Sequence, residues 1–130
     1  MTSQVTGEAL APFKQLIHDI GQAFKEKDIS KAMAKFVAED DITSFGLYAD
    51  INSKSELEQH WKDYFSAHEF MSKIEERYTV YVYGEAACLC LTHKAENSND
   101  RTKRMTLFLE NHNGAWLIRH RHHSFVPEGG

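Results

Sequence analysis

The spacing of apolar residues changes midway along the chain, and this change is the strongest constraint on the fold. Before Lys73, apolar residues recur every three or four positions, whereas from Lys73 onward they follow a two-residue period. The first spacing forms a stripe along a helix, and the second places alternate side chains on opposite faces of a strand. Helices followed by a run of strands predict an α+β fold.

Three helices are predicted in the first part. Apolar residues at helical spacing indicate a helix over residues 11–27, with Pro12 in its first turn. A shorter helix follows Asp28, a suitable N-cap. The run Ser53-Lys54-Ser55-Glu56 is a capping box that opens a third helix, and a short strand is expected at residues 42–46.

Four long strands are predicted in the second part. They are separated by Gly84-Glu85, by a polar loop at residues 97–100 and by Asn113-Gly114, and they cover residues 74–83, 86–94, 103–111 and 116–125. Asn-Gly is a strong signal for a tight hairpin. We therefore expect the last three strands to form an antiparallel meander.

The strands carry apolar residues on both faces, as Val80 and Val82 on one side and Tyr81 and Tyr83 on the other illustrate. The helices can cover one face, and the uncovered face favours a homodimer formed through the sheet. The alternative is a monomer in which Tyr81 and Tyr83 are exposed strand aromatics.

The final strand changes character along its length. Strict alternation over residues 116–124 predicts one face made of Trp116, Ile118, His120, His122 and Ser124. The opposite face would hold Leu117, Arg119, Arg121, His123 and Phe125. The first face begins apolar and ends in imidazoles and a hydroxyl, a pattern expected where a strand runs from a core into a polar site.

Length, charge and cysteine content narrow the class of protein. A chain of 130 residues is expected to form one domain spanning residues 1–130, and a net charge of −4 gives no general attraction to nucleic acid or anionic membranes. No apolar run approaches the roughly 20 residues of a membrane-spanning helix, and the N-terminus does not resemble a signal peptide. Cys88 and Cys90 are too far apart on one strand for an unstrained disulfide, which predicts reduced thiols and a cytoplasmic location.

Several short segments, in this order and spacing, carry a family resemblance: Glu26-Lys27-Asp28, residues 36–41, Ser53 to Trp61, residues 114–118 and the ending at residues 120–124. Together they resemble SnoaL-like and ketosteroid isomerase-like members of the nuclear transport factor 2-like superfamily, over residues 11–127. The resemblance implies a cone-like curved antiparallel sheet and three N-terminal helices enclosing a cavity. Superfamily members include isomerases, cyclases, dehydratases and non-catalytic binding or association domains, so the fold does not settle the function.

The residues that a ketosteroid isomerase needs are missing. The strand after the second helix offers Thr43-Ser44-Phe45-Gly46, without the expected carboxylate base. The first helix has no tyrosine, and the acid of the penultimate strand, Glu110, lies near its end. We therefore do not expect steroid isomerisation by that constellation.

The candidate catalytic residues are His122 and His120, because a neutral imidazole is a good general base near neutral pH. Ser124 or Tyr48 could donate a hydrogen bond to a substrate carbonyl, and Asp50 could orient a histidine. The alternative is that His122 and Ser124 only satisfy polar groups where strands meet helices. The candidate ligand-binding residues are Trp61, Phe13, Ile17, Tyr48, Phe65, Ile118 and Ser124, although the aromatic ones are also consistent with plain core.

His120 and His122 form a His-x-His pair on one predicted face, but no third metal ligand accompanies them, so neither a metal nor another cofactor is expected. The favoured function is binding of a small, largely apolar organic molecule. The first alternative is a cofactor-free acid–base enzyme (an isomerase, cyclase or dehydratase) that uses His122. The second is a homo-oligomeric association module like that of calmodulin-dependent kinase II.

Overall fold

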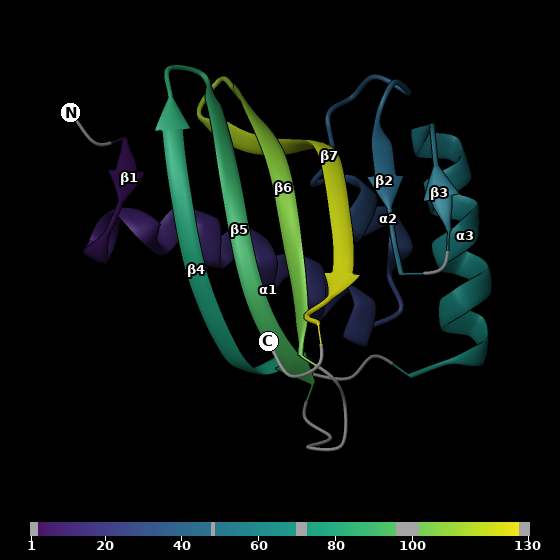
Figure 1. Ribbon diagram of the computed structural model, residues 1–130. Coiled ribbons are helices and arrows are strands. Elements are labelled where there is room, and N and C mark those ends of the chain that lie inside the picture. Colours follow the sequence, from purple (N-terminus) through teal and green to yellow (C-terminus); the bar gives the residue numbers. More distant parts are fainter. Residues whose placement is uncertain (1–2, 48, 70–72, 96–101, 128–130) are drawn as a thin grey trace.

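The computed structural model describes residues 3–47, 49–69, 73–95 and 102–127. Its centre is a curved sheet that does not close into a barrel, with the strand order β1-β4-β5-β6-β7-β2-β3 (Figure 1). The strands are β1 (Gln4–Val5), β2 (Thr43–Phe45), β3 (Asp50–Ile51), β4 (Lys73–Tyr83), β5 (Ala86–Ala95), β6 (Lys103–His112) and β7 (Ala115–Phe125). The predicted α+β class and the four long strands are confirmed; β1 and β3 were not predicted.

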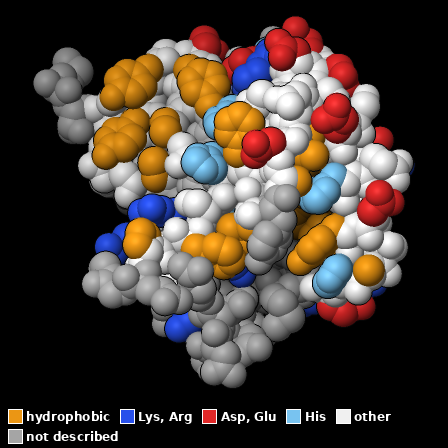
Figure 2. Space-filling model, turned by 45° about the vertical axis from the view of Figure 1, so that its right-hand side comes forward, with side chains coloured by type: hydrophobic (Ala, Val, Ile, Leu, Met, Phe, Trp, Pro, Cys, Tyr) orange, Lys and Arg blue, Asp and Glu red, His pale blue; other side chains and the backbone are white. Residues whose placement is uncertain are grey.

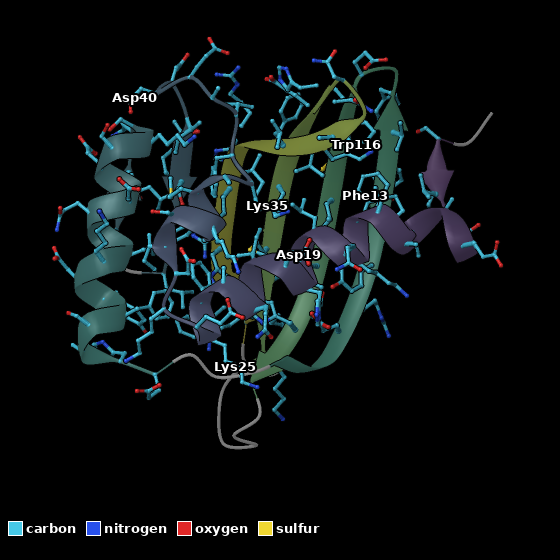
Figure 3. The ribbon with its side chains drawn as sticks, turned by 180° about the vertical axis from the view of Figure 1, so that it is seen from behind. Phe13, Asp19, Lys25, Lys35, Asp40 and Trp116 are labelled. Atoms are coloured by element: carbon cyan, nitrogen blue, oxygen red, sulfur yellow. The ribbon has the colours of Figure 1, made fainter. Side chains whose placement is uncertain are left out.

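The three predicted helices are present as α1 (Ala11–Lys25), α2 (Ile29–Met33) and α3 (Lys54–Ala67), after a 3-10 turn at Gly7–Leu10. The Asp28 side chain accepts a hydrogen bond from the Lys31 amide, and the Ser53 hydroxyl accepts one from the Glu56 amide, so both predicted N-caps are confirmed. Asp40, labelled near the start of α3 in Figure 3, also accepts bonds from the Ser55 amide and hydroxyl. In that view α1 crosses the sheet.

Tight turns connect β4 to β5 and β6 to β7. At the turn between β6 and β7, Asn113 has φ 55° and Gly114 has φ 92°. Positive φ at both central residues is what a two-residue type I′ hairpin loop requires. The predicted antiparallel meander is confirmed and also includes β4. Because β2 pairs with β7 in parallel, the sheet is mixed rather than wholly antiparallel. The predicted loop at residues 97–100 lies outside the described residues.

The hydrophobic core lies between the helices and one face of the sheet, which we call the inner face. Val80, Leu89 and Leu109 are fully buried there. At one end, the Phe13 ring of α1 lies 5.4 Å from the Trp116 ring of β7, and both are labelled in Figure 3. The aromatic contact ties the first helix to the last strand.

A β-bulge in β7 overturns the predicted alternation of its side chains. Ile118 lies opposite Leu109, but His120, two residues later, lies opposite the adjacent Phe108, so Arg119 has no partner in the ladder. An extra residue of this kind bends the strand. The side chains after it point to the opposite face from the one that regular alternation predicts. Figure 1 shows that β7 turns in its course.

The side chains beyond the bulge therefore point the opposite way from the prediction. Arg121 lies opposite the buried Leu107, and His123 lies opposite the buried Met105, on the inner face. His120, His122 and Ser124 lie opposite Phe108, Thr106 and Arg104, which are exposed on the outer face. The prediction that these three residues share a face with Trp116 and Ile118 is wrong.

The two cysteines are free thiols on β5, as predicted. Their sulfur atoms lie 3.9 Å apart, and both side chains are half-buried on the outer face rather than fully buried. Within residues 3–47, 49–69, 73–95 and 102–127, no helix combines the length and apolar character needed to cross a membrane.

Candidate functional site

A cavity of about 480 Å³ lies between the inner face of the sheet and the helices. Its walls are mostly aliphatic and aromatic, and the polar side chains gather mainly where β2, β5, β6 and β7 reach it. The described lining includes Ile17, Ile20, Phe24, Phe36, Ser44, Leu57, Trp61, Phe65, His93, Lys103, Met105, Leu107, Ile118, Arg121, His123 and Phe125.

Aromatic rings form the helical wall of the cavity. The Phe24 ring of α1 lies 4.7 Å from both the Trp61 and the Phe65 rings of α3, edge-on to the first and stacked on the second. The Phe36 ring lies 5.7 Å from Trp61. These residues share the helical stripes read from the sequence, and their mutual contacts hold the wall rigid.

A chain of hydrogen bonds connects three strands at the polar end. From Arg121, Nη1 donates to the Ser44 hydroxyl of β2 at 3.2 Å, and Nη2 donates to Nδ1 of His123 at 3.0 Å. Nε2 of His123 lies 3.0 Å from Nε2 of His93 on β5, and the two rings stack at 5.1 Å. The guanidinium also lies over the Trp61 ring, with its central carbon 5.7 Å from the ring centroid.

The order of donors along this chain follows from the chemistry of the guanidinium. Because arginine only donates, Nδ1 of His123 accepts and therefore carries no proton. The neutral His123 ring then carries its proton on Nε2 and donates it to Nε2 of His93. Both nitrogens of His123 are thus engaged, and the histidine pair adds no negative charge opposite Arg121.

The two arginines of β7 lie in contrasting surroundings. Arg119 donates to both Glu110 oxygens, at 2.8 and 3.2 Å, and to a Glu39 oxygen at 2.7 Å. These bonds raise the pKa of Arg119 and lower the pKa of Glu110 to about 2. Arg121 has no carboxylate partner among the described residues, and burial lowers its pKa to about 10.

The outer face carries a second group of histidines. Nδ1 of His120 lies 2.6 Å from the Thr43 hydroxyl, and the Phe45 ring lies edge-on to His120 and His122, at 5.4 and 6.2 Å. Burial, and then the nearby His122, lower the pKa of His120. Hydrophobic and histidine side chains gather on the surface seen in Figure 2.

The structure places the predicted site residues in two separate regions. Ile17, Trp61, Phe65 and Ile118 line the cavity, whereas Phe13 is buried in the core beside Trp116. His120, His122 and Ser124 are on the outer face and do not line the cavity, contrary to the prediction. Asp50 is exposed on β3, paired with Phe45. Tyr48 lies outside the described residues.

Sequence reasoning missed the polar residues that do reach the cavity. Arg121 and His123 were assigned to the opposite face, and Ser44 and His93 were not singled out. The two-residue period along β5 could have identified His93, because its side chain shares a face with the buried Leu89 and Leu91. In the described part of the chain, no group of three or more histidine, cysteine or acidic side chains is arranged to hold a metal ion.

Comparison with known proteins places these features in a family. A family model described as a SnoaL-like domain matches residues 14–128. A comparison with curated proteins found no match. Among solved structures, the chain resembles a nuclear transport factor 2-like protein of unknown function from Pseudomonas putida, with 24% identity, 89% of this chain and 85% of that chain covered, and a TM-score of 0.75.

Two further solved structures share the fold at lower identity. One is a candidate dehydratase of the nuclear transport factor 2-like family from Streptomyces avermitilis, with 11% identity, coverage of 91% and 96%, and a TM-score of 0.78. The other is a candidate calcium/calmodulin-dependent protein kinase II association domain from Xanthomonas campestris, with 19% identity, coverage of 95% and 91%, and a TM-score of 0.70. At these identities the likeness concerns the fold alone.

Proposed function

The chain belongs to the SnoaL-like domain family, and from this membership we propose that it binds a small, largely apolar organic molecule in its cavity. The observation that carries the proposal is the cavity itself. Its volume of about 480 Å³ is in the range of pockets that hold small ligands, and aromatic and aliphatic side chains form most of its walls. A few polar groups converge at one end, which is the usual arrangement for orienting such a ligand.

Binding can be tested with a pair of bicyclic probes of nearly equal shape, 2-naphthoate and the neutral 2-acetylnaphthalene. Native mass spectrometry would detect co-purified molecules, and tryptophan fluorescence, to which Trp61 of the cavity wall contributes, would follow titration with each probe. Ile20→Phe places extra volume at the cavity wall and should weaken binding, whereas Leu117→Phe, a change away from the lining, should not. If nothing co-purifies and neither probe binds, the proposed function is wrong.

A cofactor-free acid–base enzyme is the second candidate, and the observation in its favour is that histidines line the cavity, with His93 and His123 at its polar end. The predicted base, His122, lies on the outer face, so proton transfer in the cavity would instead use the hydrogen-bonded pair of His123 and His93. The methyl group of 2-acetylnaphthalene lies beside a carbonyl and can report proton abstraction. Nuclear magnetic resonance in D₂O should show that the native protein, but not His123→Asn, accelerates deuterium exchange at this methyl group. If the native protein does not accelerate the exchange, the enzyme candidate is wrong.

We also propose a homodimer formed through the outer face of the sheet. Three exposed aromatic side chains support it: Tyr83 at 66% exposure, Phe108 at 43% and Phe45 at 38%. Tyr83, Phe108 and Phe45 belong to β4, β6 and β2, so the patch extends across the sheet. An apolar surface of this kind is a frequent site of association between copies of a chain. The same face would serve an association module, the third candidate.

We further place the protein in a reducing compartment such as the cytoplasm. Cys88 and Cys90, the two cysteines of the chain, support this proposal because both are free thiols. Titration of accessible thiols in protein released from its natural source should find both thiols reduced; their isolation as an oxidised pair would contradict the assignment.

A further inference from the structure

We infer that the ligand of the cavity carries a carboxylate group and that Arg121 binds it. This inference rests on the proposed binding function and specifies the class of ligand: a compact apolar body with one carboxylate at its polar end. Three features of Arg121 lead to it, namely its free hydrogen-bonding capacity, its lack of a counter-charge and its position at the polar end of a mostly apolar cavity.

The guanidinium has donors left over after its contacts within the protein. Nη1 donates to Ser44 and Nη2 to His123, which fixes the plane of the group, while Nε donates to no described residue. Among the described residues, no buried side-chain nitrogen or oxygen lacks a partner, so Nε must reach accessible space. Because Arg121 lines the cavity, that space is available to a ligand.

The positive charge of Arg121 has no counter-charge at the described cavity wall. The one carboxylate in the described lining, Glu69, is exposed and pairs with Lys27 at 3.1 Å. His123 is neutral because it accepts from the guanidinium, and Lys103 adds a second cation to the lining. Burying a cation without a partner is unfavourable, and a bound anion would remove that cost.

The shape of the site favours a carboxylate over a multiply charged phosphate. A guanidinium presents parallel N–H groups that match the two oxygens of one carboxylate. The central carbon of the guanidinium lies over the Trp61 ring, 5.7 Å from its centroid, so an aromatic surface and not a second polar group faces the guanidinium on that side. Most of the remaining wall is apolar, including Phe24, Phe36 and Leu107, and this wall suits a hydrocarbon body rather than further charges.

The two naphthalene probes test this inference, because they differ mainly in replacing a carboxylate oxygen with a methyl group. The native protein should bind 2-naphthoate about ten- to a hundred-fold more tightly than 2-acetylnaphthalene, as expected for charge-assisted hydrogen bonds. Arg121→Met should abolish this preference while leaving the affinity for the neutral probe within about three-fold of the native value. Arg121→Lys, which keeps the charge but loses the planar fork, should retain part of the preference. Arg104→Met is the matched control, since Arg104 is exposed on the outer face and the preference should persist.

The outcomes separate this inference from the function on which it rests. Failure of both probes to bind would overturn the binding function and the inference together. Binding of both with equal affinity by the native protein would overturn the inference alone, and this result needs no variant to fold. A carboxylate preference that survives in Arg121→Met would also overturn it, because another cation would then hold the ligand.

Discussion

Two substitutions on one strand, Arg119→Met and Arg121→Met, should differ in their effect on stability: the first should destabilise the protein and the second should be nearly neutral. Both remove a cation from β7 and leave a flexible apolar side chain of similar length. Arg119 is bonded to two carboxylates, whereas Arg121 has no carboxylate partner among the described residues. The same chemical change therefore removes a favourable charge pair in one case and a poorly solvated charge in the other.

The cost of Arg119→Met follows from its partner Glu110. The hydrogen bond from Arg119, and then the one from His112, lower the pKa of Glu110 from 4.5 to about 2. That shift corresponds to at most about 3 kcal/mol. The Arg119 and Glu110 side chains are 23% and 27% exposed, so solvent screening reduces the expected loss to about 1–2 kcal/mol at pH 7. A lowered carboxyl pKa stabilises the fold above pH 4.5, and this contribution is lost as the pH falls towards 2.

Arg121→Met should be close to neutral. Burial lowers the pKa of Arg121 from 12.5 to about 10, which corresponds to a cost of up to about 3 kcal/mol for holding the charge at pH 7. The cavity exposes part of the side chain and reduces that cost. The hydrogen bonds to Ser44 and His123, worth about 1 kcal/mol each, and the contact with Trp61 offset most of what remains. We expect a change within about 1 kcal/mol of the native protein.

Urea unfolding, followed by far-ultraviolet circular dichroism, measures both free energies of unfolding at pH 7. Repeating the Arg119→Met comparison from pH 6 down to about pH 3 should show its deficit shrinking below about pH 4.5, because Glu110 takes up a proton in the unfolded chain there while the native carboxyl, with a pKa of about 2, stays ionised. If Arg121→Met loses more stability than Arg119→Met, then Arg121 has a compensating partner and its assignment as an uncompensated cavity cation is wrong.

Three further predictions concern the fold and the outer face. Ser53→Ala removes the hydroxyl that caps α3 and should cost about 1 kcal/mol in urea unfolding; no loss would mean that the Asp40 contacts suffice to cap the helix. Leu109→Ala leaves a hole beneath the bulge and should cost about 2–5 kcal/mol, and a loss below about 1 kcal/mol would show that the site collapses around it. Phe108→Glu places a charge on the exposed apolar face and should convert the proposed homodimer to a monomer. Light scattering after size-exclusion chromatography measures the mass, and an unchanged dimer mass would show that the outer face is not the interface.

Much of the fold could be predicted because it depends on local patterns. Asp28 and Ser53 cap helices through contacts within three residues, and Asn113-Gly114 adopts the left-handed values that its turn requires. The period of apolar residues located the three helices and the four long strands. Strands β1 and β3 were missed because each has two residues, too few for a period to appear.

The candidate site was predicted only in its apolar half. Trp61 and Ile17 lie on helical stripes that must face inward, so their place at the cavity followed from spacing. The polar half depended on counting alternate residues along β7 past Ile118, and a single unpaired residue, Arg119, reversed the count. No glycine or proline marks that position, so nothing local distinguishes it from regular strand.

The sequence by itself determined the α+β class, the helix caps, the hairpin turn and the apolar character of the cavity wall, because each rests on interactions between near neighbours or on a period. The tertiary structure alone decided which side chains reach the cavity from β7. The bulge forms where β7 bends, between its pairing with β6 on one side and its contacts with Phe36 and β2 on the other. That long-range pairing turns Arg121 and His123 inward and leaves His120 and His122 outside.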